Sequence, residues 1–324
     1  MDEIVTVDER FRSLALPNAW LQRYCGGMMW AEGPVYFADL DLLLWSDIPA
    51  NRLMRLTGDS VTEFRSPSNF SNGNTLDFQG RLVSCEHGTR RVTRTEIDGS
   101  ITVLADSYRD RRLNSPNDVV LKSDGSIWFT DPDYGILTGY EGYRAEREQD
   151  GCHVYRVDPV TGDISVAADD FARPNGLCFS PDESTLYVSD TSASHDPGGN
   201  HHIRAFDVDG SGRLRNPRLF AEVAPGLPDG FRVDEYGNIW TSCAEGVHCY
   251  SPAGELLGKI LVPEAVSNLT FGGPRRNRLF ITASTSIYSL YVAVRGCGNE
   301  STTESGVSAD VVIGRSENTK TVLG

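Results

Sequence analysis

Short runs of apolar residues alternate with polar turns along most of the chain, and one such pattern recurs six times. Each copy opens with a polar residue, runs through an apolar strand and a turn rich in Gly, Asp or Pro, and closes with a second apolar strand. The opening residue and the end of the second strand are 14 or 15 residues apart in every copy, as from Glu32 to Asp47. The opening residues are Glu32, Asn72, Asn117, Asn175, Asp229 and Asn268. Alternation of this kind around a turn predicts six β-hairpins.

The segments between these hairpins alternate in the same way around turns of their own. RRVTRTEIDGSITVLA turns at Asp98 and Gly99, and HVYRVDPVTGDISVAA turns at Gly162. Two hairpins make a four-stranded unit, which recurs about every 39 to 59 residues. Repeated four-stranded sheets with this period form the blades of a β-propeller. The pattern therefore predicts an all-β, six-bladed β-propeller with four-stranded blades.

The last unit lacks one strand, because only residues 286–294 have a strand pattern after the sixth hairpin. Residues 19–25, directly before the first unit, can supply the missing strand and join the two ends of the ring. We therefore expect an N-terminal extension (1–18), a propeller catalytic domain (19–295) and a polar C-terminal tail (296–324) rich in Ser, Thr and Gly.

The six opening residues share one place in the repeat. Each begins the inner strand of its blade, so their side chains are expected to meet at one end of the central channel. Six oxygen-bearing side chains, two of them carboxylates and none of them Cys or His, are typical ligands of a hard cation such as Ca²⁺. Turn formation explains Asn72 and Asn268 about as well, but it explains Glu32 poorly, because Glu is not a turn residue. The expected ligands of one divalent cation are Glu32, Asn117, Asn175 and Asp229.

Four motifs resemble the family of six-bladed propellers that includes gluconolactonases, regucalcin (senescence marker protein) and luciferin-regenerating enzyme. They are WAEGPVY, LNSPNDVV, RPNGLCFSPDESTLYVSD and LPDGFRVDEYGNIW, and the likeness spans about residues 18 to 294. NGNTLDFQGRLVSCEHGTRRVTR and NSPNDVVLKSDGSIWFTDPDYG are most similar to the bacterial gluconolactonase branch. The resemblance implies a Ca²⁺ ion held by Glu32, Asn175 and Asp229. It also implies that Asn117 is a ligand or lies beside the ion, and that Asp229 is the base.

A divalent cation with open coordination positions can polarise a carbonyl oxygen, and a carboxylate beside it can remove a proton from water. No GxSxG motif or ordered Ser/His pair offers a covalent nucleophile. We therefore expect direct hydrolysis of a small-molecule lactone of the sugar type, with Asp229 as ligand and base. Insertions at 132–151 and 191–202 follow second strands and flank the same mouth, where loops commonly select the substrate. The expected substrate contacts are Asn117, Asn72, His87 and Asn268.

Composition narrows the class of protein. Hydrophobic residues make up 39% and charged residues 23% of the 324 residues, as in soluble globular proteins. The net charge of −15 disfavours binding to nucleic acid or anionic membranes, because both attract a positive face. No stretch approaches the roughly 18 apolar residues of a spanning helix, and the acidic N-terminus does not look like a signal peptide. Seven cysteines without CxxC spacing argue against a disulfide framework and a zinc site. We expect a cytoplasmic, reduced protein.

Two other functions remain open at this point. The same cation would polarise P=O as readily as C=O, so a metal-dependent phosphotriesterase or arylesterase is the alternative enzyme. A non-catalytic propeller that binds proteins is the alternative outside enzymes, although a scaffold would not need Glu32 and Asp229 to face its channel together. Ca²⁺ is the expected ion, with Zn²⁺, Mg²⁺, Mn²⁺ and Fe²⁺ as alternatives. The sequence leaves the natural lactone and the oligomeric state open.

Overall fold

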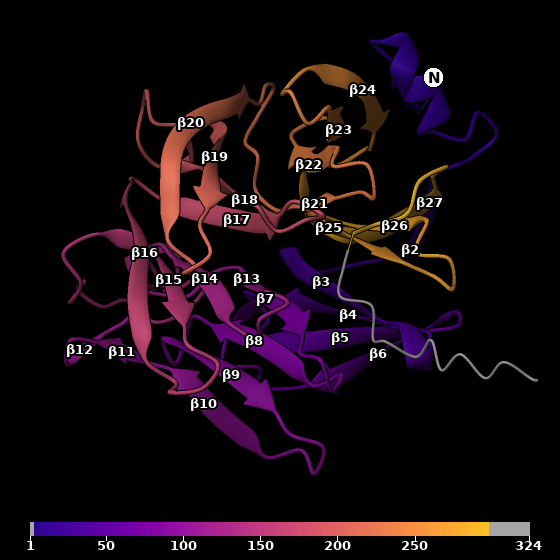
Figure 1. The fold of residues 1–324 in the computed structure, drawn as a ribbon. Helices are drawn as coiled ribbons and strands as arrows, with labels where there is room; N and C mark the ends of the chain where they lie inside the picture. The colour runs from indigo at the N-terminus through magenta and orange to yellow at the C-terminus, as the bar shows by residue number, and fades with distance from the viewer. Residues whose placement is uncertain (1–2, 298–324) are drawn as a thin grey trace, which may run out of the picture.

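A computed structural model describes residues 3–297 and shows six blades arranged around a central axis (Figure 1). The inner strands are β3 (Ala31–Phe37), β7 (Ser71–Leu76), β13 (Val119–Leu121), β17 (Pro174–Phe179), β21 (Phe231–Val233) and β25 (Val266–Gly272). The second strands are β4 (Leu42–Asp47), β8 (Leu82–Glu86), β14 (Ile127–Asp131), β18 (Thr185–Asp190), β22 (Ile239–Cys243) and β26 (Arg278–Ala283). The third strands are β5 (Arg52–Thr57), β9 (Arg91–Thr95), β15 (Cys152–Val157), β19 (His202–Val208), β23 (Gly246–Tyr250) and β27 (Ser286–Tyr291). The outer strands are β6 (Ser60–Arg65), β10 (Ile101–Ala105), β16 (Ile164–Phe171), β20 (Leu214–Glu222), β24 (Leu256–Leu261) and β2 (Gln22–Gly26). The predicted six-bladed propeller is confirmed.

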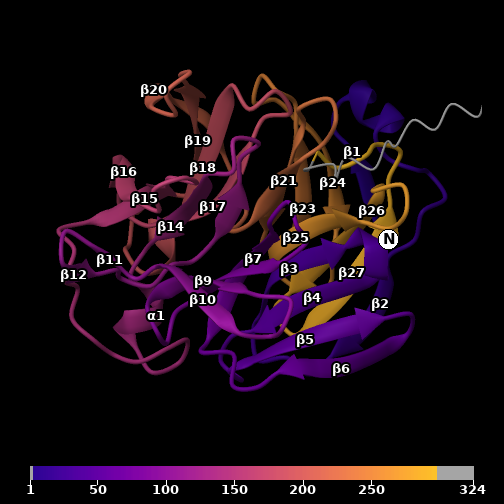
Figure 2. The ribbon, with the colours of Figure 1, turned by 60° about the horizontal axis from the view of Figure 1, so that its bottom comes forward.

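The ring closes by pairing the two ends of the chain, as the sequence predicts. β2 lies antiparallel to β27, with Gln22 opposite Ser289 and Gly26 opposite Ser286. Figure 2 shows this indigo strand beside the yellow strands of the sixth blade. The backbone hydrogen bonds of one sheet therefore hold the first and last parts of the propeller together.

Residues ahead of β2 also pack on the propeller. β1 (Ile4–Thr6) pairs with β24 and gives the fifth blade a fifth strand. The 3₁₀ turn η1 (Glu9–Ser13) buries Phe11, whose ring centroid lies 5.8 Å from that of Trp240. The segment expected as an N-terminal extension thus contributes both a strand and a core side chain to the fifth blade.

The remaining elements are short. They are the two-stranded ribbon β11 (Ser107–Tyr108) and β12 (Arg111–Arg112), the 3₁₀ turns η2 (Ala38–Leu40) and η3 (Ser192–Ser194), and the helix α1 (Tyr134–Leu137). Within residues 3–297, no helix has the length and apolar character needed to cross a lipid bilayer. The polar tail expected at 296–324 lies outside the described residues from residue 298 onward.

The hydrophobic core of the propeller lies between its blades. Over residues 3–297 the buried apolar side chains form six clusters, and each cluster joins two neighbouring blades. Leu44 and Leu82 share the cluster between the first and second blades. Between the third and fourth blades, Trp128 meets Phe179 edge to face with ring centroids 5.5 Å apart. A single blade cannot bury its own apolar faces, so the blades stabilise one another around the ring.

Glycine follows the opening polar residue in four of the six copies. These are Gly33, Gly73, Gly176 and Gly230. A Cβ on Gly176 would lie 2.3 Å from the carbonyl oxygen of Asp229 in the next blade, and one on Gly73 would lie 2.5 Å from that of Asn117. The close approach lets the Gly176 N–H donate to Asp229 O over 3.1 Å, and the Gly73 N–H donate to Asn117 O over 2.7 Å. The Ser189 hydroxyl also donates to Asp229 O, over 3.0 Å. The backbone of Asn117 and that of Asp229 are thus each held by a hydrogen bond from the preceding blade.

Candidate active site

A cavity of about 350 Å³ opens where the inner strands begin. Five of the six opening polar residues line it: Glu32, Asn72, Asn117, Asn175 and Asp229. Other parts of the wall come from the loops after β14, β18 and β22, because in an antiparallel hairpin the second strand ends where the first begins. The cavity has the size of a small-molecule site.

Three of the cavity residues carry carboxyl groups, Glu32, Glu141 and Asp229, and none of them takes part in an ion pair within residues 3–297. Glu32 is 4% exposed, and its Oε2 accepts a hydrogen bond from Asn268 Nδ2 over 3.0 Å. Burial raises the pKa of Glu32 to about 8, an effect that the Asn268 hydrogen bond opposes and the charge of Asp118 increases. Burial also raises the pKa of Asp229 well above its ordinary value, and the negative charges of Glu32 and Glu141 raise it further.

Burial is the main cause of both raised pKa values, and nearby acidic groups raise them further. A divalent cation between Glu32 and Asp229 would supply the compensating charge. Asn117 and Asn175 line the same cavity and offer amide oxygens, so the donor set contains the ligands that Ca²⁺ prefers. The residues present therefore fit a hard divalent cation.

Thr130, on the second strand of the third blade, contacts the backbone of both asparagines. The Thr130 hydroxyl donates to the carbonyl oxygen of Asn175 over 2.7 Å, and the Thr130 carbonyl accepts from the Asn117 N–H over 2.8 Å. The Asn175 amide Nδ2 also donates to Thr191 Oγ1 over 3.1 Å. The backbone of both residues and the side-chain amide of Asn175 are thus positioned before any ligand arrives.

Two predicted substrate contacts lie behind the cavity wall. Asn268 contacts Glu32, as described above, and His87 is fully buried. His87 Nε2 accepts from Asn72 Nδ2 over 3.3 Å, and its Nδ1 donates to the carbonyl oxygen of Glu141 over 3.1 Å. Burial lowers the pKa of His87 to about 4, so the ring is neutral near pH 7 and both nitrogens are used. The structure therefore places His87 as a link between Asn72 and the loop of Glu141.

The insertions expected to flank the mouth do line the cavity. Tyr134 and Glu141 come from the segment 132–151, and Thr191 begins the insertion after β18. The Tyr134 hydroxyl lies 2.6 Å from Thr191 Oγ1, so the two insertions are in contact. Burial raises the pKa of Glu141 to about 7. The repeat does not reveal Tyr134 or Glu141 because both lie outside it, and the extra length of the segment was the only signal.

Arg173 joins the two insertions at a second point. Its Nε lies 2.8 Å from Asp133 Oδ1, and its guanidinium also pairs with Asp196. The same cation lies 5.9 Å from the centroid of the Tyr134 ring. Arg173 thus bridges one acid from each insertion and braces the wall that Tyr134 forms.

The region of the chain that is similar to known proteins includes the residues of the cavity. The family described as SMP-30/Gluconolactonase/LRE-like region matches residues 30–285, a span that holds all six opening polar residues. The gluconolactonase of Zymomonas mobilis is 33% identical over 285 residues, covering 80% of this chain and 78% of the relative.

Two solved structures resemble the fold. A gluconolactonase from Xanthomonas campestris is 40% identical with a TM-score of 0.83, covering 89% of this chain and 94% of the other. Regucalcin from Agrobacterium tumefaciens, named as a calcium-binding protein, is 20% identical with a TM-score of 0.68, covering 85% of this chain and 93% of the other. At that lower identity, regucalcin shows a shared fold alone.

Proposed function

The chain belongs to the SMP-30/gluconolactonase/LRE-like family, and we propose that it hydrolyses sugar lactones with one divalent cation held at the mouth of the propeller. The names of the two gluconolactonases support a lactone-hydrolysing enzyme. One structural observation supports the proposal of a bound cation. Glu32 and Asp229 lie in one cavity without an ion pair in the described part of the chain, and amide side chains stand beside them.

Glu32, Asn117, Asn175 and Asp229 are the proposed ligands. All four line the cavity and all four offer oxygen, which favours Ca²⁺ over cations that prefer nitrogen or sulfur. When bound, a divalent cation supplies a Lewis acid that polarises the ester carbonyl and offsets the negative charge that develops on its oxygen.

Asp229 is the proposed general base. Glu32 is almost fully buried, whereas Asp229 is partly exposed, so water in the cavity can reach its carboxylate. A carboxylate whose pKa is raised above its ordinary value is a better proton acceptor than an ordinary surface aspartate. Asp229 takes a proton from the attacking water as the water oxygen bonds to the carbonyl carbon. The ester C–O bond then breaks, the ring oxygen regains a proton, and the product is the hydroxy acid.

The other cavity residues suit a polyhydroxylated ring. Asn72 and Asn117 present amide groups that can both donate and accept hydrogen bonds. Tyr134 and Glu141 add a phenol and a carboxyl group from the insertion after β14. We propose that these four side chains bind the hydroxyl groups of the lactone and so orient its carbonyl carbon toward Asp229.

The direct test is a pH-stat assay of acid release from a panel of aldonolactones, other five- and six-membered lactones, an aryl ester and an aryl phosphotriester. Protein treated with a strong chelator should be inactive, and added Ca²⁺ should restore lactone hydrolysis. Glu63→Gln, which changes an exposed acid on β6, is the control for Glu32→Gln and should keep full activity. Lactone turnover that survives complete removal of metal, or turnover of the phosphotriester alone, would contradict the proposal.

A further inference from the structure

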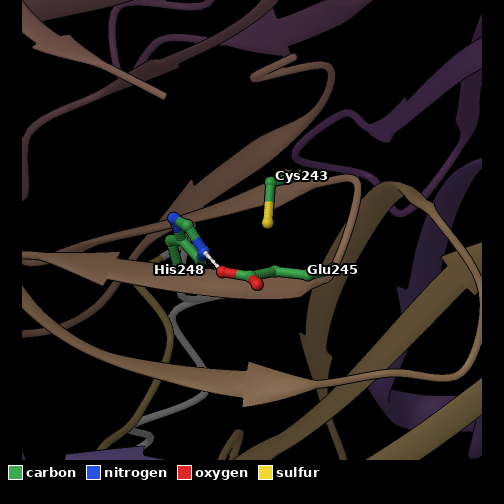
Figure 3. Close-up of side chains that lie close together, drawn as sticks. All are labelled: Cys243, Glu245 and His248. Atoms are coloured by element: carbon green, nitrogen blue, oxygen red, sulfur yellow. Dashed lines mark hydrogen bonds and ion pairs between the residues drawn. The ribbon is translucent and has the colours of Figure 1, made fainter. Parts of the chain in front are cut away.

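A second group of metal-ligand side chains lies in the fifth blade, at the turn between β22 and β23. Cys243 ends β22, Glu245 lies in the turn, and His248 is on β23. One potential ligand atom from each of the three residues lies within 4.8 Å of the other two. Figure 3 shows the Cys243 thiol directed toward the hydrogen-bonded pair of Glu245 and His248.

The hairpin register explains why these residues meet. Cys243 is opposite Gly246 and Thr241 is opposite His248, so Cys243 and His248 project from the same face of the sheet. Gly246 offers no side chain at the position opposite Cys243. The Cys243 thiol donates to the Gly246 carbonyl oxygen over 3.4 Å, a contact that an ion bound to the sulfur would replace.

We propose that Cys243, Glu245 and His248 form a binding site for a thiophilic divalent cation such as Zn²⁺, separate from the oxygen-lined site. Zinc binds sulfur, imidazole nitrogen and carboxylate oxygen at about 2.0–2.3 Å in a tetrahedral arrangement, so two ligand atoms of one ion lie roughly 3.3–3.8 Å apart. The three ligand atoms lie within 4.8 Å of one another, so the side chains must move together by up to about 1–1.5 Å to bind the ion. The mixture of sulfur, nitrogen and oxygen suits Zn²⁺ and does not suit Ca²⁺.

The contacts of the three side chains are consistent with an ion that enters from the cavity. Glu245 Oε1 accepts from His248 Nε2 over 2.8 Å and from Lys259 Nζ over 2.6 Å, which keeps the carboxylate charged. His248 is fully buried, yet its Nδ1 has no hydrogen-bond partner among residues 3–297, so these residues do not fix both nitrogens of this ring as they do for His87. Cys243 lies on the wall of the active-site cavity, which gives an ion a route to the thiol.

The hairpin that carries this site also holds the segment of Asp229. The Ser242 N–H donates to Gly230 O over 3.1 Å, and the Ala244 N–H donates to Pro225 O over 3.0 Å. These two bonds lie on either side of Asp229 in the sequence. A cation at the turn would therefore rigidify the segment before β21 that presents Asp229 to the cavity.

Co²⁺ is the probe for this site, because a cobalt–thiolate bond gives a charge-transfer band in the near ultraviolet that oxygen ligands do not give. The wild-type protein, titrated under reducing conditions, should show the band and lose it when Zn²⁺ is added. Asp229→Asn should keep the band, since none of the four proposed ligands of the other cation carries sulfur. Cys25→Ser, a change to a half-buried cysteine in the sixth blade, is the matched control and should also keep it.

Two variants then identify the ligands. Cys243→Ser should abolish the band, and His248→Gln should weaken Co²⁺ binding by at least about tenfold, since changes outside the ligand shell already cost that much. Circular dichroism of each variant checks that the propeller is intact. Absence of the band in the folded wild-type protein, or an undiminished band in Cys243→Ser, would overturn the proposal whether or not the lactonase assay succeeds.

Discussion

Asn268 Nδ2 donates to Glu32 Oε2 over 3.0 Å, and this bond crosses the seam where the sixth blade meets the first. The Gly33 N–H donates to the same carboxylate oxygen. Ser267, next to Asn268, donates from its hydroxyl to the carbonyl oxygen of Ala31, next to Glu32. The position of one proposed cation ligand therefore depends on the closure of the ring.

We expect substitutions of Glu32 and Asn268 to have effects of different size. Glu32→Gln removes a negative charge from the site and should lower Ca²⁺ affinity by about tenfold or more, since a ligand should cost at least as much as its supporting residues. Asn268→Ala keeps the charge and removes only the supporting bond, so its effect on affinity and turnover should be smaller. Calorimetric titration with Ca²⁺ measures the affinity of each variant, and the lactone assay measures its turnover.

Two further asparagines extend the comparison. Asn175→Ala should weaken Ca²⁺ binding as Glu32→Gln does, whereas Asn72→Ala should leave it nearly unchanged, because Asn72 is a proposed substrate contact. Small and equal effects from all four variants would favour the view that these residues serve only as turn formers.

The packing of neighbouring inner strands can be tested with Gly176→Ala. The new methyl group would lie 2.3 Å from Asp229 O, so the strands must separate or the hydrogen bond between them must break. We expect a loss of about 1–3 kcal/mol in the free energy of unfolding, as for other overpacked sites. Urea denaturation measures the loss. Gly139→Ala is the control, since a Cβ there meets nothing within 4 Å, and equal stability of the two variants would refute the close-approach argument.

The propeller was predictable because its blades are copies, and a repeated hairpin shows its period in the sequence. The closing strand was predictable for a related reason: the sixth unit lacked a partner that residues 19–25 could supply. The contact of Asn268 with Glu32 was not predictable, because position in the repeat gives the end of the channel and not the direction of a side chain.

The two insertions and the turn between β22 and β23 also contain contacts that could not be predicted from the sequence. Tyr134 and Glu141 reach the cavity through a segment without periodicity, so only the length of that segment was informative. Cys243 and His248 have no recognised zinc spacing and meet because a tight turn places them on one face of a hairpin. A contact of this kind depends on strand register, which hydrophobic alternation fixes only after the fold is known.

His87→Gln should change how stability responds to acid. The folded pKa of about 4 lies below the usual value near 6.5, so the unfolded chain takes up a proton first as the pH falls. The wild-type protein should therefore lose up to about 3 kcal/mol of stability from this residue between pH 6.5 and pH 4. Glutamine can both accept from Asn72 and donate to the Glu141 carbonyl without titrating, so the variant should lack this loss.

The measurement is the difference between the two proteins in urea unfolding at several pH values. The raised pKa values of Glu32 and Asp229 act in the opposite direction, because their folded forms hold protons more tightly, but they are common to both proteins and cancel. Parallel stability curves across pH 4 to 6.5 would show that His87 is not buried as a neutral ring.

Asp229→Asn separates the two roles proposed for this residue. The amide keeps the shape and an oxygen ligand, and Asn117 and Asn175 supply such oxygens already, so the variant should fold and bind Ca²⁺ more weakly. The amide cannot accept a proton from water, so kcat should fall by about 10² to 10⁴, the scale for loss of a general base. Lactone hydrolysis is measured at Ca²⁺ well above the variant's own Kd, which removes occupancy as a cause. Activity close to wild type under those conditions would leave Asp229 as a ligand only. The base would then be sought at Glu141, whose pKa of about 7 and place on the cavity wall also suit proton transfer.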